Sequence, residues 1–176
     1  MSLLSRFCRG LDRVCGRLST VTGEWVAWLT LFMALATAAV VISRTFFREG
    51  SVALQESVTY MHALVLMIAA AYTMHKDGHV RVDIFYRRYS PLQKAWINAL
   101  GTLLFLLPFC IFTLAISWQY VANAWAIREV SMDAGGLPAI FLLKTLILVN
   151  AMLLMLQGLA DLARNLITLT FADDHG

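Results

Sequence analysis

Charged residues are scarce in this sequence. Only 14% of its 176 residues are Asp, Glu, Lys or Arg, whereas 60% are hydrophobic. Soluble domains have about a quarter charged residues and about 45–50% apolar ones. The mean hydropathy of +0.71 departs in the same direction. Together these values indicate that lipid surrounds most of the chain, and they predict an all-α integral membrane protein.

Residues that carry out chemistry are also few. The three cysteines, Cys8, Cys15 and Cys110, are odd in number and lack a CxxC spacing, so neither a disulfide framework nor a zinc site is predicted. The sequence has no phosphate-binding loop and no Ser-His-Asp arrangement. A haem between helices needs two facing histidines, but only His62 lies well inside a hydrophobic run. We therefore expect no catalytic, cofactor-binding or metal-binding residue, no cofactor and no enzymatic activity.

The sequence contains long hydrophobic runs instead. About 20 apolar residues cross a hydrocarbon core of about 30 Å. We predict a transmembrane domain of residues 23–161 with four spanning helices at about 25–46, 52–74, 94–119 and 138–160. The third run has no charged residue from Ala95 to Ile127, which is more than one crossing needs, and Pro108 predicts a kink in it.

The first 22 residues have the pattern of a basic amphipathic helix. Apolar residues recur three or four positions apart, on one helical face, while four arginines occupy other positions. This pattern predicts a helix on the membrane surface, with its arginines among anionic lipid headgroups. A helix packed on a partner protein is the alternative, and nucleic acid is not an expected partner. The apolar residues are Leu4, Phe7, Leu11, Val14 and Leu18.

The polar stretch from His75 to Lys94 predicts the topology. Short loops rich in Lys and Arg remain in the cytoplasm. This loop has five such residues and the N-terminal segment four, whereas the first predicted outer turn has one, or two with Arg44, and the second has one. We therefore predict cytoplasmic N- and C-termini, with residues 162–176 as a cytoplasmic tail. Ser90, Pro91 and Gln93 predict a capping box at the start of the third span. The topogenic candidates in the loop are Lys76, Arg81, Asp83, Arg87 and Arg88.

Apart from Lys94 at the first position of the third span, three charged side chains, Arg44, Glu56 and Lys144, fall within the predicted spans. Ionisable groups at such depth need a partner, a cavity or a proton. Glu56 has three interpretations: a carboxylate bound to the N-terminus of its own helix, a buried ion pair or subunit contact, or a proton or ion relay. Lys144 can extend outward along its long stem. Since the topology places them at similar depth, we predict that Glu56 pairs with Lys144, or that one of them pairs with Arg44.

Four stretches carry a family likeness that spans most of the chain. They are Leu54-Gln55-Glu56, the segment AYTMHKDGHVRVDIFY at 71–86, Arg87-Arg88-Tyr89-Ser90-Pro91, and Gly135-Gly136-Leu137-Pro138 with Lys144. In these stretches the chain resembles the small membrane subunit, called DctQ-like, of tripartite ATP-independent periplasmic (TRAP) transporters. The segment GHVRVDIFYRR is the most specific part of the likeness.

The resemblance implies a role without chemistry. It implies a non-catalytic small permease subunit in the bacterial inner membrane that scaffolds a large membrane subunit during sodium-coupled uptake of a small organic acid. The expected partners are that large subunit, a periplasmic substrate-binding protein and membrane lipids. A membrane-anchor subunit of a respiratory or other multi-subunit complex is the alternative. By analogy, candidates for docking the binding protein are Arg48, Glu49, Arg128, Glu129 and Asp133.

Overall fold

A computed structural model describes residues 3–76, 78 and 86–173, and every regular element within them is helical. The elements are α1 (Leu3–Ile42), the π-helix η1 (Ser43–Phe47), α2 (Val52–His75), α4 (Pro91–Gly101), the π-helix η2 (Thr102–Leu106), α5 (Leu107–Ala126) and α6 (Ile140–Asp173). Four stretches are long and apolar enough to cross a membrane: Thr20–Phe47, Val52–His75, Pro91–Ala126 and Ile140–Thr170. The predicted fold class with four spanning helices is therefore confirmed.

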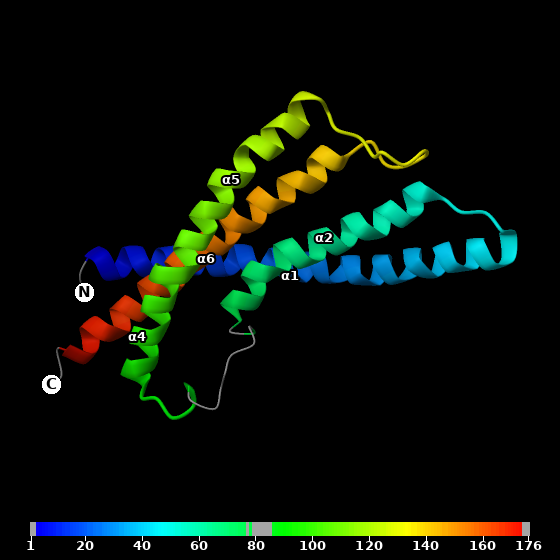
Figure 1. Cartoon of the computed structure of the whole chain (residues 1–176). Coiled ribbons are helices and arrows are strands. Elements are labelled where there is room, and N and C mark those ends of the chain that lie inside the picture. Colours follow the sequence, from blue (N-terminus) through cyan, green and yellow to red (C-terminus); the bar gives the residue numbers. More distant parts are fainter. Residues whose placement is uncertain (1–2, 77, 79–85, 174–176) are drawn as a thin grey trace.

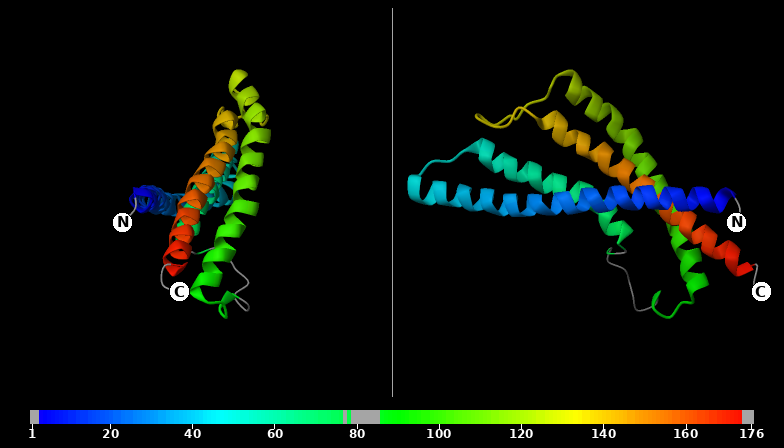
Figure 2. Two further views of the ribbon diagram at one scale, coloured as in Figure 1. Left: turned by 90° about the vertical axis from the view of Figure 1, so that its left-hand side faces the viewer. Right: turned by 180° about the vertical axis from the view of Figure 1, so that it is seen from behind.

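The helices form two antiparallel hairpins, as Figure 1 shows. The first joins α1 to α2, and the second joins the continuous rod α4–η2–α5 to α6. Helix α6 contacts α1, α2, α4 and α5, so it connects the two hairpins (Figure 2). We call the end with the connections 48–51 and 127–139 the turn end, and the opposite end, where α2 and α6 finish and α4 begins, the terminal end.

Local sequence signals explain where two of the helices start. At α2, the Ser51 side chain accepts a hydrogen bond from the Leu54 N–H at 3.3 Å. At α4, Ser90 accepts from the Gln93 N–H at 3.3 Å, and Gln93 Oε1 accepts from the Ser90 N–H at 2.9 Å. This is the capping box predicted for the third span, with Pro91 in the first turn of the helix.

The rod that forms the third span changes its winding next to Pro108. Proline has no N–H, and its ring would press on the carbonyl of Leu104, four residues earlier. Just before it, η2 adopts π-helical winding, and the Leu107 N–H bonds to the Thr102 carbonyl. The predicted disturbance at Pro108 is thus a π-helical turn, and a bend between α4 and α5 is visible in Figure 1. The rod continues to Ala126, beyond the predicted end at 119.

Two helices are longer than the sequence predicted. Helix α1 has 40 residues and no break at residue 22, so the predicted surface helix and the first span are one element. Helix α6 continues to Asp173, where a tail was predicted from residue 162. Neither Gly nor Pro follows Gly158 within α6, and Asn165 donates its side-chain N–H to the Asp161 carbonyl at 2.8 Å. The residues after 161 therefore continue the helix of the fourth span.

Two glycines let α1 lie close to α2. A Cβ at Gly16 would be 2.6 Å from Cε1 of the His75 ring, and a Cβ at Gly23 would be 2.4 Å from Cγ of Tyr72. Real Cβ atoms do not approach other atoms this closely. The absence of side chains at these positions therefore allows α1 to pack against the last turns of α2.

Candidate functional site

Glu56 holds the α5–α6 loop at the turn end. It is the fifth residue of α2 and is partly buried. Its Oε2 accepts a hydrogen bond from the Leu137 N–H at 2.5 Å, and its Oε1 accepts one from the Ser131 hydroxyl. The N-terminus of α2 is capped by Ser51 instead. The carboxylate thus crosses from the first hairpin to the second, and we call these contacts of Glu56 with Ser131 and Leu137 the carboxylate latch.

The loop that receives Glu56 is folded on itself. The Ser131 N–H donates to the Leu137 carbonyl at 3.2 Å, and the Gly136 N–H donates to the Asp133 carbonyl at 2.9 Å. Gly135 has a φ of 80°, which favours glycine. A Cβ on Gly136 would lie 2.4 Å from Ser131 Oγ and 2.8 Å from Glu56 Oε1. The two glycines therefore have different roles: one allows the turn, and the other makes room for the carboxylate.

Lys144 has a separate partner. Its Nζ lies 2.5 Å from Glu129 Oε2 and 4.0 Å from the centroid of the Tyr120 ring. The Lys144 side chain is 16% exposed and that of Glu129 27%. Helical side chains lean toward the helix N-terminus, so Lys144 extends along α6 to the turn end, where Glu129 follows α5. The predicted pair of Glu56 with Lys144 is therefore wrong: each binds the α5–α6 region separately.

Arg44 binds the residue next to Glu56. With the Gln55 amide oxygen facing the guanidinium, this oxygen accepts from Arg44 Nε at 3.1 Å and from Nη2 at 2.6 Å. This contact links η1 to α2 across the turn of the first hairpin. Arg44 pairs with neither Glu56 nor Lys144, contrary to the sequence-based alternative. The motif Leu54-Gln55-Glu56 thus has two polar side chains that each secure a different connection at the turn end.

The ion pair of Lys144 and Glu129 gives a testable prediction. Replacing Lys144 by methionine, or Glu129 by glutamine, leaves one charge at the turn end without its partner, and we expect each change to lower the unfolding temperature by a few degrees. Each single reversal, Glu129→Lys or Lys144→Glu, should also destabilise the chain, and the two reversals together should recover part of that loss. Thermal unfolding in detergent measures all of these variants. If the reversed pair is no more stable than the worse single reversal, Glu129 is not the partner of Lys144.

The docking candidates differ in how available they are. Arg48, Glu49, Arg128 and Asp133 are exposed at the turn end, whereas Glu129 is engaged with Lys144. Both arginines have a positive φ: 56° for Arg48, directly after η1, and 46° for Arg128, two residues after the end of α5. This conformation is uncommon for residues with a side chain and usually belongs to glycine at a helix C-terminus. Because Glu129 is engaged, four of the five docking candidates predicted from the sequence remain exposed.

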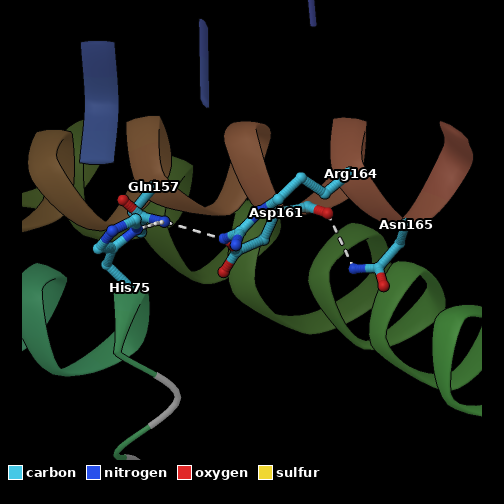
Figure 3. A network of polar contacts seen from close by, with 5 residues as sticks. All are labelled: His75, Gln157, Asp161, Arg164 and Asn165. Atoms are coloured by element: carbon cyan, nitrogen blue, oxygen red, sulfur yellow. Dashed lines mark hydrogen bonds and ion pairs between the residues drawn. The ribbon is translucent and has the colours of Figure 1, made fainter. Parts of the chain in front are cut away.

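A polar cluster at the terminal end was missed by the sequence analysis. Gln157, only 1% exposed, donates from Nε2 to Asp161 Oδ1 at 3.1 Å and lies 3.4 Å from Nδ1 of His75. Asp161 also pairs with Arg164. Figure 3 shows His75 at the end of α2 facing these α6 residues. Gln157 and Asp161 are four residues apart on a helix, which was the only available signal.

The remaining predicted residues are the topogenic candidates of the loop between α2 and α4. Arg81 and Asp83 of the topogenic loop lie outside the described residues. Lys76 lies 5.8 Å from the ring centroid of Tyr72, and Arg87 and Arg88 are exposed. Within residues 3–76, 78 and 86–173, no three His, Cys, Asp or Glu side chains gather in a group that could hold a metal ion.

Comparison with known proteins identifies a family for most of the chain. Residues 33–168 match the family model described as "Tripartite ATP-independent periplasmic transporters, DctQ component". These residues include the carboxylate latch, the pair of Lys144 and Glu129, and the terminal-end cluster. No curated protein and no solved structure matches the chain.

Proposed function

Because the chain belongs to the DctQ component family of tripartite ATP-independent periplasmic transporters, we propose that this transporter subunit, which is not an enzyme, scaffolds the large membrane subunit. In this proposal the large subunit carries the substrate, a small organic acid, together with a coupling cation. A periplasmic binding protein delivers the substrate, and the assembly resides in the bacterial inner membrane. The family match favours this function over an anchor subunit of a respiratory complex.

The observation that carries the proposal is that the charged residues within the spans bind other residues of this same chain. Glu56 binds Ser131 and Leu137, Arg44 binds Gln55, and Lys144 binds Glu129. All of these contacts hold the helices and turns of this chain to one another. A substrate pathway instead needs polar groups that converge on a bound molecule near the membrane midplane. The charges thus support a structural role for the subunit.

The exposed apolar surface supports association with another membrane subunit. Large hydrophobic side chains are exposed along α1 and along the rod α4–η2–α5, among them Leu35 at 59%, Phe105 at 75% and Phe112 at 61%. Helix association within lipid relies on packing and on occasional polar contacts. A rigid pair of hairpins with such a surface offers a partner a fixed template, while the rest of the surface contacts lipid.

We further propose that the terminal end faces the cytoplasm and the turn end the periplasm. Nine Lys and Arg residues lie in the N-terminal segment and in the loop 75–94, and the turn end has fewer. Helix α1 has 40 residues and is about 60 Å long, whereas the bilayer with its headgroups is about 45 Å thick. Its basic N-terminal part therefore extends toward the cytoplasmic headgroups, and the exposed Arg48, Glu49, Arg128 and Asp133 face the binding protein.

Charge removal in the cytoplasmic loop tests this function. Replacing Arg81, Arg87 and Arg88 together by glutamine should lower the amount of large subunit that co-purifies with the chain, or invert the topology, because the topogenic charge is lost. Substrate preference of the remaining complex should not change. Co-purification and labelling of single cysteines from either side measure both effects. An altered substrate range with normal assembly would contradict a scaffold role, as would isolation of this chain as a transporter that works alone.

A further inference from the structure

A cavity of about 760 Å³ opens at the terminal end between α2, α4 and α6. Leu106 of η2 and Leu154 of α6 line its inner part. Nearer the terminal end the lining consists of Ile97 and Asn98 from α4 and of Asp161, Arg164, Asn165 and Thr168 from α6. On α6 the wall therefore changes from apolar to polar along the direction in which a membrane changes from hydrocarbon to headgroups.

Glycines explain why this space exists. A Cβ at Gly158 would lie 2.6 Å from Leu106 Cδ2, so the missing side chain lets α6 cross η2 closely. Between this crossing and the terminal end, α4 and α6 diverge, as Figure 1 shows. Gly101 lines the opening, and a Cβ there would meet no atom within 4 Å. The cavity is thus formed by the backbone arrangement.

The mouth of the cavity carries positive charge in a fixed position. Arg164 pairs with Asp161, which also accepts a hydrogen bond from the buried Gln157, so the guanidinium is anchored on α6 (Figure 3). A guanidinium has five N–H donors, so it can hold a carboxylate and a phosphate oxygen at the same time. Lys94 lies outside the lining, with its Nζ 5.3 Å from the ring centroid of Tyr86, a residue of the cavity wall.

We propose that this cavity binds one anionic phospholipid. Its phosphate lies at Arg164, and the part of an acyl chain nearest the glycerol packs against Leu106 and Leu154. Basic pockets between transmembrane helices are suited to anionic headgroups. Asn98 and Asn165 each use one amide N–H within the chain, to the Tyr86 hydroxyl and the Asp161 carbonyl, and the second N–H of each can donate to the glycerol and ester oxygens. The inference depends on the cavity alone and holds whether or not the chain acts as a transporter scaffold.

The experiment measures lipid binding to the purified full chain in detergent. Native mass spectrometry follows titrations with phosphatidylglycerol, with phosphatidylcholine and with inorganic phosphate. Gly101→Leu fills the cavity, and the open space at Gly101 together with the low helix propensity of glycine predicts an unfolding temperature at or above that of the wild type. Ala115→Leu, on the exposed face of α5, is the matched control for added apolar volume. Arg164→Gln removes the cation from the mouth, and Arg48→Gln is its control at the turn end.

We expect one phosphatidylglycerol per wild-type chain and its loss in Gly101→Leu. Arg164→Gln should weaken phosphatidylglycerol binding about tenfold, because one charge-assisted contact with the phosphate is lost. It should also remove the preference over phosphatidylcholine, because the guanidinium repels the choline ammonium and this repulsion is lost with Arg164. Both controls should bind as the wild type does. Equal binding of both lipids by the wild type, binding of inorganic phosphate as tight as that of the lipid, or undiminished lipid binding by Gly101→Leu would each overturn the proposal. A loss of co-purifying protein in Gly101→Leu without any loss of lipid would also overturn it and would assign the cavity to a protein segment.

Discussion

Replacing Glu56 by alanine is expected to lower the free energy of unfolding of this chain by about 3 kcal/mol. The change removes the acceptor of two hydrogen bonds, from Leu137 N–H and from the Ser131 hydroxyl. A hydrogen bond to a charged group contributes about 1.5–3 kcal/mol, and a donor left buried without an acceptor adds a cost. Thermal unfolding in detergent, followed by tryptophan fluorescence, measures the loss. Hydrogen exchange at the Leu137 amide should increase in parallel.

The control for this variant is Glu49→Ala. Glu49 is also a glutamate at the turn end, but it is exposed, so its replacement should change the free energy of unfolding by less than about 0.5 kcal/mol. If Glu56→Ala were no more destabilising than Glu49→Ala, and the Leu137 amide exchanged at its wild-type rate, Glu56 would not hold the α5–α6 loop.

Replacing Gly136 by alanine should destabilise the same loop by about 1–3 kcal/mol. The new Cβ would lie 2.4 Å from Ser131 Oγ and 2.6 Å from Ser131 Cβ. Ser131 would have to move away from residue 136, and its hydrogen bond with Glu56 would be disturbed. Gly101→Ala provides the matched control, because a Cβ there meets open space and alanine favours a helix. Differential scanning fluorimetry in detergent compares the two. Equal unfolding temperatures would show that the close approach at Gly136 is not needed.

A double variant tests whether Gly136 acts through the latch. If Gly136→Ala mainly displaces Glu56, it should cost little more once Glu56 has been replaced by alanine, and the two effects should not add. Additive effects within about 0.5 kcal/mol would assign the cost of Gly136→Ala to some other contact.

Features that depend on neighbouring residues could be predicted from the sequence. Long hydrophobic runs predicted the four spans, and the spacing of Ser90 and Gln93 predicted the capping box. Pro108 predicted a disturbed helix, although the sequence alone did not show that it would be a π-helical turn. These signals are local because they depend on helix period, backbone donors and caps, which a short stretch of sequence determines.

The partners of the charged residues could not be predicted. Glu56 reaches Ser131 and Leu137, which lie far away in the sequence, and similar depth in the membrane does not show which residues face each other. Depth alone suggested Lys144 as the partner, but the direction of its side chain takes it to Glu129. The helix contacts made possible by Gly16, Gly23 and Gly158 were likewise hidden, since a glycine does not reveal which neighbour requires the space.

The central claim is that the charged residues within the spans hold this subunit together and do not serve substrate or ion passage. Its most direct test is uptake by the assembled transporter in proteoliposomes. The Glu56→Ala complex would be compared with the wild type over a range of substrate and coupling-cation concentrations, with rates divided by the amount of assembled complex. We predict less assembled complex, but a substrate KM within about twofold of the wild type and the same response to the cation as the wild type shows. Normal assembly with a changed KM or a changed response to the cation would contradict the claim and place Glu56 on the transport pathway.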